Sequence, residues 1–258
     1  MDSGVERVLQ AVRAGGLLLP DAPVVVLLSG GRDSVCLLDL AVRVAGPAAV
    51  TALHVNYGLR DEADGDEAHS RALCEHLGVE LVVERPQWPG GGNVQAWARD
   101  VRYGAAASLA LARGARVAAG HTASDQAETV LYRLATSPGR RALLGMRARD
   151  GSLVRPLLAF SREQTTSYCR ARGLAWRDDV TNDGDVFARA RVRNTLLPAL
   201  RSLHPAAERN VVRTAALLRD EAEVLEAAVA GVLAGADHIG LARLAALEAP
   251  LRRLVVRR

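Results

Sequence analysis

Short apolar runs alternate with stretches of helical periodicity through the first 160 residues of the chain. The runs predict strands at residues 24–28, 50–55, 79–84 and 116–120, with a fifth at 153–157. The intervening stretches predict helices at residues 34–44, 66–77, 94–113 and 124–134. Alternation of this kind indicates an α/β fold, a parallel sheet with helices on both faces. In such sheets ligands bind beyond the carboxyl ends of the strands.

After residue 160 the pattern changes to helices separated by arginine-rich loops. Residues 206–258 have a helical pattern throughout, with Pro205 and Pro250 as the expected breakers. We therefore predict a first domain at residues 1–205, with its core at 22–160 and a helical, arginine-rich part at 161–205. A helical extension is predicted at residues 206–258.

All 33 basic residues of the 258-residue chain are arginine, and lysine is absent. This composition excludes Schiff-base chemistry on a protein lysine and the phosphate-binding lysine of a Walker A loop. Charge is divided unevenly: residues 1–132 carry 11 Arg and 16 Asp or Glu, a net −5, whereas residues 133–258 carry 22 Arg and 13 Asp or Glu, a net +9. The second half is therefore suited to a polyanionic partner.

The sequence has no run of about 18 apolar residues, and its first residues lack the basic segment of a secretory signal. We expect a cytoplasmic protein without a membrane partner. Cys36, Cys74 and Cys169 lie far apart and form no Cys-x-x-Cys motif, so we expect buried thiols and no zinc or iron–sulfur site. The oligomeric state does not follow from the sequence.

The first strand runs directly into a glycine-rich loop, and a helix follows it. Glycines let the backbone approach a phosphate, and amides at a helix amino terminus bind anions. An aspartate in such a loop would repel phosphate unless Mg2+ lies between them. The alternative is an ordinary turn in which Asp33 or Ser34 caps the helix. The loop consists of Ser29, Gly30, Gly31, Arg32, Asp33 and Ser34.

This loop resembles the PP-loop of the ATP pyrophosphatases, which cleave ATP between its α- and β-phosphates. Further motifs, in the same order along the chain, resemble the tRNA(Ile)-lysidine synthetase family. The match extends from about residue 22 to about residue 205. Its motifs are HVNYGLR at 54–60, ARDVRY at 98–103, GHTASDQAET at 120–129, RPLL at 155–158 and GLAW at 173–176.

The resemblance implies a PP-loop fold and a two-step reaction on the wobble cytidine of a tRNA(Ile) with a CAU anticodon. ATP, with Mg2+, adenylates the base and releases pyrophosphate. Free L-lysine then displaces AMP to form lysidine. In this interpretation the six loop residues hold ATP, and Asp33 is both a catalytic residue and the metal ligand.

Asp125 and Glu128 lie three residues apart at the start of a predicted helix, so that both carboxylates face one side. A free lysine amine has a pKa near ~10.4, which places its neutral form roughly 4–5 kcal/mol uphill at pH 7. Carboxylates that hold the ammonium group and accept its proton would offset part of this cost. We assign both residues to lysine and Asp125 also to catalysis. Alternatively, Thr122 and Asp125 form only a capping box, with Glu128 a favourable first-turn charge.

His121 closes the fourth predicted strand, and we assign it to the nucleotide and to catalysis. Asn56 and Arg60 follow the second predicted strand and are assigned to ATP, with turn and surface roles as the alternative. Four features depart from the family pattern. Thr122 stands where a second histidine is common, Ser124 where an aspartate is common, and Tyr57 where a histidine is common. The Arg-Gly-x-Gly pattern expected after the helix is replaced by Thr-Ser-Pro-Gly at 136–139, followed by Arg140 and Arg141.

Residues 133–219 carry 17 Arg and 7 Asp or Glu, a net +10. Such a surplus fits contacts to the tRNA backbone, which give affinity without sequence information. The alternative for each arginine is a solvated surface position. Several of these arginines lie before or within a helix that we expect to end at Pro198. The arginines assigned to tRNA are Arg99, Arg102, Arg140, Arg141, Arg189 and Arg193.

Three other functions stay open at this stage. A PP-loop tRNA thiolase would be expected to show catalytic or cluster-binding cysteines. A nucleotide-binding module without catalysis would not need Asp33, Asp125 and Glu128. An amide-forming PP-loop enzyme that acts on a small metabolite would leave the basic second half unexplained. The extension at residues 206–258 is interpreted as a short or truncated tRNA-contacting region.

Overall fold

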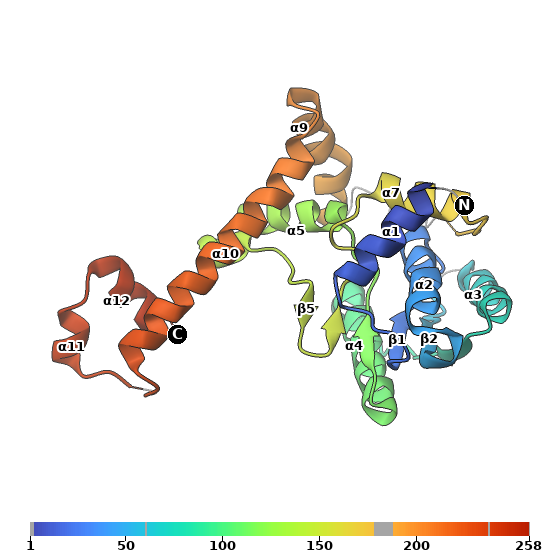
Figure 1. Ribbon diagram of the computed structural model, residues 1–258, viewed down its shortest axis with the longest axis horizontal. Coiled ribbons are helices and arrows are strands. Elements are labelled where there is room, and N and C mark those ends of the chain that lie inside the picture. Colours follow the sequence, from blue (N-terminus) through green and yellow to red (C-terminus); the bar gives the residue numbers. More distant parts are fainter. Residues whose placement is uncertain (1–2, 60, 178–187, 237, 258) are drawn as a thin grey trace.

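The computed structural model describes residues 3–59, 61–177, 188–236 and 238–257 of the chain (Figure 1). Its centre is a six-stranded sheet in the order β3-β2-β1-β4-β6-β5, in which only β5 runs antiparallel to its neighbour. The predicted α/β fold with a parallel sheet is confirmed. The strands are β1 (Val24–Leu27), β2 (Val50–Val55), β3 (Glu80–Glu84), β4 (Arg116–Ala118), β5 (Arg149–Asp150) and β6 (Leu153–Val154).

Helices cover both faces of this sheet, and a helical region follows it in the chain (Figure 1). The first seven helices are α1 (Ser3–Ala14), α2 (Arg32–Ala45), α3 (Ala63–Leu77), α4 (Val94–Arg113), α5 (Ala123–Thr136), α6 (Arg140–Leu143) and α7 (Arg162–Ala171). The later ones are α8 (Ala188–Arg191), α9 (Leu197–Leu203), α10 (Ala207–Leu233), α11 (Leu241–Ala245) and α12 (Ala249–Val256). A short 3-10 helix (Pro47–Ala49) precedes β2, and a π-helical segment (Val192–Leu196) joins α8 to α9.

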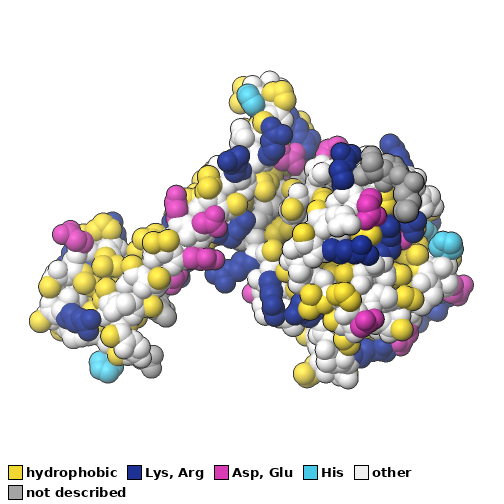
Figure 2. Space-filling view, viewed as in Figure 1, with side chains coloured by type: hydrophobic (Ala, Val, Ile, Leu, Met, Phe, Trp, Pro, Cys, Tyr) yellow, Lys and Arg dark blue, Asp and Glu magenta, His cyan; other side chains and the backbone are white. Residues whose placement is uncertain are grey.

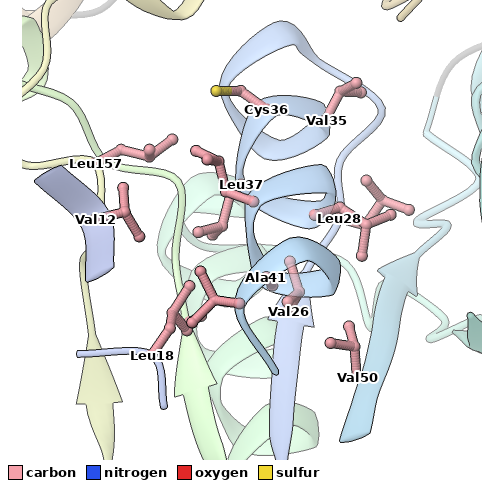
Figure 3. Close-up of a cluster of buried hydrophobic side chains, with 14 of the residues drawn as sticks. Val12, Leu18, Val26, Leu28, Val35, Cys36, Leu37, Ala41, Val50 and Leu157 are labelled. Carbon is pink, nitrogen blue, oxygen red and sulfur yellow. The ribbon is translucent and has the colours of Figure 1, made fainter. Parts of the chain in front are cut away.

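The core has one apolar layer on each face of the sheet. On one face α1, α2, α3 and α7 pack against the strands, and Figure 3 shows Val12, Leu37, Val26 and Leu157 meeting there. On the other face α4 supplies Ala106 and Ala110. All four residues of β1 are buried, which explains its continuous apolar sequence.

Local signals fix the long helix α4 at the predicted bounds. The Asn93 side chain accepts hydrogen bonds from the amides of Gln95 at 3.0 Å and Ala96 at 3.1 Å, as a helix cap does. At the other end Gly114 takes a left-handed conformation with φ of 58°, which favours glycine.

The predicted fifth strand is shorter than expected. Strand β6 ends at Val154; the Arg155 amide makes one more bond in register with β5, to the Ala148 carbonyl at 2.8 Å, and Pro156 has no amide proton to donate. The two-residue β5 and the amino-terminal α1 were not predicted.

One prediction about proline was wrong. Pro198 does not end a helix, because it lies in the first turn of α9, directly after the π-helical segment. Pro250 lies in the first turn of α12, just after the break that separates α12 from α11, as a breaker would. First-turn positions tolerate proline, since their amides have no partner within the helix.

Residues 206–258 are also not helical throughout, because α10 ends at a left-handed Ala234 with φ of 49°. The first part of α10 packs on α5 and α9, where Val211 and Val212 meet the buried Leu131 and Leu197. Its second part carries α11 and α12 away from the sheet as an arm (Figures 1 and 2). The division of the chain near residue 205 stays a prediction. Among the described residues, no helix combines the length and apolar character needed to cross a bilayer.

Candidate active site

The loop after β1 has the geometry of an anion cradle. Gly30 takes φ of 80°, and α2 begins at Arg32 with Gly31 as its cap and no side-chain hydrogen bond to the cap. The Ser34 hydroxyl donates to the Gly31 carbonyl at 2.7 Å and accepts from the Ser29 amide at 3.2 Å, so the turn holds its own shape. The start of α2 leaves backbone amides that are suited to phosphate oxygens.

A second strand end approaches this loop very closely. Gly120 follows β4, and a Cβ atom at that position would lie 3.0 Å from the Asp33 carbonyl oxygen and 3.2 Å from the Ser34 amide nitrogen. Only glycine fits there without a shift of the backbone. The loop at residues 29–34 and the motif that begins at Gly120 are therefore held side by side at the carboxyl edge of the sheet.

Asp33 is engaged by two neighbours. Its carboxylate accepts from the Arg32 guanidinium at 3.1 Å on each oxygen, and from the Thr165 hydroxyl of α7 at 2.6 Å. Its side chain keeps 20% exposure. The described residues contain no cluster of three or more metal-ligating side chains.

Asp125 combines a capping role with an ion pair. One carboxylate oxygen accepts from the Thr122 amide and hydroxyl at 2.8 Å each, which completes the capping box, and the other accepts from Arg162 at 2.9 Å. Burial acts to raise the pKa of Asp125, but Arg162 and the Thr122 hydrogen bonds outweigh it and lower that pKa. Asp125 is therefore ionised at neutral pH.

Glu128 lies one helical turn further on and is almost completely buried. Its carboxylate accepts two hydrogen bonds from Arg193, at 2.8 and 2.9 Å, and lies 2.9 Å from Arg162. Arg162 thus bridges Asp125 and Glu128. These two acids, together with Asp33, raise the pKa of Arg162 against the opposing effect of its burial. We call Asp125, Glu128, Arg162 and Arg193 the acidic site.

His121 lies beside this site in a basic environment. Burial is the main cause that lowers its pKa to about 4; Asp125 acts in the opposite direction, and Arg155, Arg102 and Arg99 lower it further. The imidazole is therefore neutral at pH 7.

The predicted contact of Asn56 with ATP has a structural alternative in the fold. The Asn56 amide nitrogen donates to Asp64 at 3.0 Å and to Glu67 at 3.1 Å, and its oxygen accepts from the Gly58 amide at 3.0 Å. Its polar atoms thus hold the turn after β2. Arg60, which was also assigned to ATP, lies outside the described residues.

The six arginines assigned to tRNA fall into different environments. The guanidinium groups of Arg99 and Arg102 lie 5.0 and 5.5 Å from the centre of the Tyr103 ring.

Arg141 pairs with Glu226 of α10 at 3.3 Å, and Arg189 lies 5.7 Å from the Tyr132 ring centre. Arg140 is half-buried at the start of α6, and Arg193 points inward to Glu128. Figure 2 shows arginine side chains along both sides of the junction between the arm and the sheet domain.

Sequence reasoning missed Arg162, Thr165 and Arg155, which the fold brings to the same sheet edge. A signal for two of them was present in the sequence. Ser161 and Gln164 form a capping box, which starts α7 at Arg162 and so places Arg162 and Thr165 at the amino-terminal end of that helix.

The cysteines lie apart from this site. Cys36, Cys74 and Cys169 are free and buried. A hydrogen bond with Cys169, together with burial, raises the pKa of Cys36, and burial raises that of Cys74 to about 11. Neither thiol is activated as a nucleophile.

A glycine loop between a central parallel strand and a helix, facing polar strand ends, defines a PP-loop domain, and the chain matches the PP-loop domain family over residues 2–200. It is 40% identical over 252 residues to a tRNA(Ile)-lysidine synthase of Salinispora arenicola, covering 91% of this chain and 74% of that protein. The chain belongs to the tRNA(Ile)-lysidine synthase family.

Other similarities agree with this family and fold. A tRNA(Ile)-lysidine synthase of Thermus thermophilus is 43% identical over 215 residues, which make up 81% of this chain and 42% of that protein. The chain thus spans about half the length of several curated relatives that it matches. Among solved structures, the U34-tRNA thiolase NcsA of Methanococcus maripaludis superposes with a TM-score of 0.66 at 18% identity, covering 84% of this chain and 79% of that one. That likeness concerns the fold.

Proposed function

We propose that the protein ligates free L-lysine to the wobble cytidine of tRNA(Ile) with a CAU anticodon, in the cytoplasm, at the expense of ATP. An adenylated cytidine is the intermediate, and AMP and pyrophosphate are the other products. The observation that carries this proposal is the acidic site beside the glycine loop, in a member of the lysidine synthase family.

ATP binds at the loop of residues 29–34 in this proposal. The amides at the start of α2 take the phosphate oxygens, and the Ser29 and Ser34 hydroxyls keep the turn in shape. His121, neutral beside the loop, contacts the nucleotide without adding a charge. None of these contacts needs a protein lysine.

Mg2+ fits the donor set as an ion shared between ATP and one carboxylate. This ion commonly uses one or two carboxylates plus substrate phosphates, and a dedicated cage of protein ligands is not needed. Asp33 is that carboxylate, and Arg32 has to release it to the ion. When bound, the ion neutralises charge on the phosphates.

Lysine binds at the acidic site, with its ammonium group between Asp125 and Glu128. Both carboxylates are already matched by Arg162 and Arg193, so lysine enters by displacing one guanidinium. Arg193 is the one to move, because it reaches Glu128 from the segment that joins α8 to α9 and comes no nearer than 3.9 Å to Asp125. A tRNA phosphate that attracts Arg193 would open the lysine site. Once the charges are exchanged, a carboxylate accepts a proton from the bound ammonium group, and the resulting neutral amine attacks the adenylated cytidine and displaces AMP.

Transfer of labelled lysine tests the proposed function directly. The full chain is incubated with ATP, radiolabelled lysine and a tRNA(Ile) transcript with a CAU anticodon. Label should enter the tRNA only when ATP is present, and one AMP should form for each lysine transferred. A transcript with the CAU anticodon changed to GAU, which has no wobble cytidine, is the matched control. Absence of label in the CAU transcript would contradict the proposal, and incorporation of sulfur from a sulfur donor would support a thiolase.

A further inference from the structure

A second group of charged side chains lies at the carboxyl ends of β4 and β6. Strand β4 pairs with β6, so His121 and Arg155 follow neighbouring strand ends. Helix α4 brings Arg99 and Arg102 to the same place, where both guanidinium groups lie near the Tyr103 ring and act on His121. We call Arg99, Arg102, Arg155 and His121 the basic site.

Arg155 is the least exposed arginine of this site, with 6% of its surface accessible. One terminal nitrogen donates to the Arg147 carbonyl at 2.6 Å, whereas its Nε is buried and has no hydrogen-bond partner within the described chain. Burial is the main cause that lowers the pKa of Arg155, and Arg99 and Arg133 add to it, against Tyr103 and Asp150. The fold therefore holds a buried cation near other cations with part of its hydrogen-bonding capacity unused.

Two further polar atoms in the site share this condition. Arg102 Nε and His121 Nδ1 are buried and also lack a partner among the residues that the structure describes. A buried polar group without a hydrogen bond destabilises the folded protein. Three such atoms in one site indicate that a bound ligand supplies the missing hydrogen bonds.

The neighbouring acids do not fill this role. Asp125 faces His121, but its oxygens are taken by Thr122 and Arg162. Asp150 interacts with Arg155 from the exposed strand β5 and leaves the Arg155 Nε without a partner. The missing group is thus an anion, and it must accept several hydrogen bonds at once. Phosphate oxygens match guanidinium groups in this way.

We propose that Arg99, Arg102, Arg155 and neutral His121 form a phosphate-binding site, separate from the glycine loop, that holds the substrate while the base is modified. This inference rests on the proposed function, because it uses the phosphates of that reaction. The phosphate belongs either to the tRNA backbone next to the wobble nucleotide or to the nucleotide itself. Arg99 is exposed and keeps the site open to a macromolecule.

Two binding measurements on the full chain distinguish these sources. One is filter binding of the CAU tRNA(Ile) at several salt concentrations, and the other is calorimetric titration with a non-hydrolysable ATP analogue without tRNA. Arg102→Gln is the decisive variant, because Arg102 is only half-buried and its loss spares the core. Arg155→Gln is the second variant, with a thermal melt to confirm folding, since it also loses the bond to Arg147. Arg7→Gln, on the exposed side of α1, is the charge-matched control.

If the site holds a tRNA phosphate, Arg102→Gln weakens tRNA binding about 5- to 10-fold and reduces the salt slope by about one, while the affinity for the ATP analogue is unchanged. If it holds the nucleotide, the affinity for the analogue falls and the tRNA salt slope stays as in the wild type. Unchanged affinities for both ligands, or equal losses for both, would overturn the site. Failure of the proposed function appears separately, as a wild-type protein that transfers no lysine.

Discussion

The acidic site and the basic site meet at His121, which belongs to the basic site, and they are satisfied to very different degrees. In the acidic site both carboxylates are matched by Arg162 and Arg193 at hydrogen-bonding distance. In the basic site three buried polar atoms, on Arg102, Arg155 and His121, have no partner among the described residues.

This difference separates two ways of binding a charged ligand. At the acidic site a ligand must replace a charge that the protein already supplies, so the affinity reflects an exchange. At the basic site a ligand adds bonds that the protein lacks, so little is displaced. An exchanged charge can couple two substrates, because the released arginine is then free to meet another anion.

The largest expected effect lies at Asp33, whose pairing resembles that of the acidic site. Asp33→Asn removes the charge but keeps the shape, so one hydrogen bond from Arg32 is lost while the surrounding fold stays close to wild type. Loss of the metal-binding charge should lower tRNA-dependent pyrophosphate release by at least ~100-fold. Circular dichroism should show an intact fold.

Thr165→Val is the matched control for that change. It removes one hydrogen bond to Asp33 and leaves the carboxylate charged, so the loss of pyrophosphate release should be far smaller. Wild-type turnover by Asp33→Asn would refute its role with Mg2+. Equal losses in the two variants would indicate that Asp33 acts through its position and not its charge.

The exchange at the acidic site is tested at Glu128. Glu128→Gln should raise the KM for lysine about 10- to 100-fold, the value of a hydrogen bond to a charged group, and change the KM for ATP little. Arg193→Gln should act in the opposite direction and tighten lysine binding to the free protein, because it removes the competing cation. Steady-state kinetics and calorimetry with lysine measure the two effects.

The double variant Glu128→Gln with Arg193→Gln separates lost binding from a stranded charge. Glu128→Gln alone leaves Arg193 without its partner, and the double variant does not. If the KM for lysine stays high in the double variant, Glu128 contacts lysine. Equal changes in the requirements for lysine and ATP would argue against that contact.

Elements with a complete local pattern were the predictable part of the fold. Strand β2 and helix α4 have the predicted bounds, since apolar periodicity and caps at Asn93 and Gly114 fix α4 locally. Strands β5 and β6 have two residues each, too few to show a period. Helix α1 was readable, because Val5, Leu9 and Val12 recur at helical spacing and are buried.

The candidate active site also has a part that the sequence predicts and a part that it does not. The glycine loop and the pair of acids are local motifs, so the sequence shows them. The arginines that match Glu128 and Asp125 are 65 and 37 positions away, and no local pattern encodes those pairings. From the sequence Arg193 was assigned to tRNA, and the fold pairs it with Glu128.

A smaller effect on tRNA binding is expected when one exposed and one inward-facing arginine are changed together. Arg189 is exposed, whereas Arg193 is paired with Glu128. Changing both to glutamine should weaken tRNA binding about 3- to 10-fold and flatten its salt dependence, with each phosphate contact contributing roughly 0.7–0.9 to the slope. Filter binding across a salt series measures this. An unchanged slope in the double variant would remove both residues from the tRNA interface.

The last expected effect is a pH dependence of stability that originates at His121. Its pKa in the folded protein is about 4, against 6.5 for an ordinary histidine, so between these values the unfolded chain binds the proton that the folded chain refuses. Stability should therefore be complete above pH 6.5 and fall as the pH drops toward 4, by at most about 3 kcal/mol. Urea unfolding at pH 7.0, 5.5 and 4.5 measures the loss, with His121→Gln as the comparison, because glutamine cannot take the proton. The variant should lose less stability over this range than the wild type. Parallel losses in the two proteins would show that His121 is not held neutral in the folded protein.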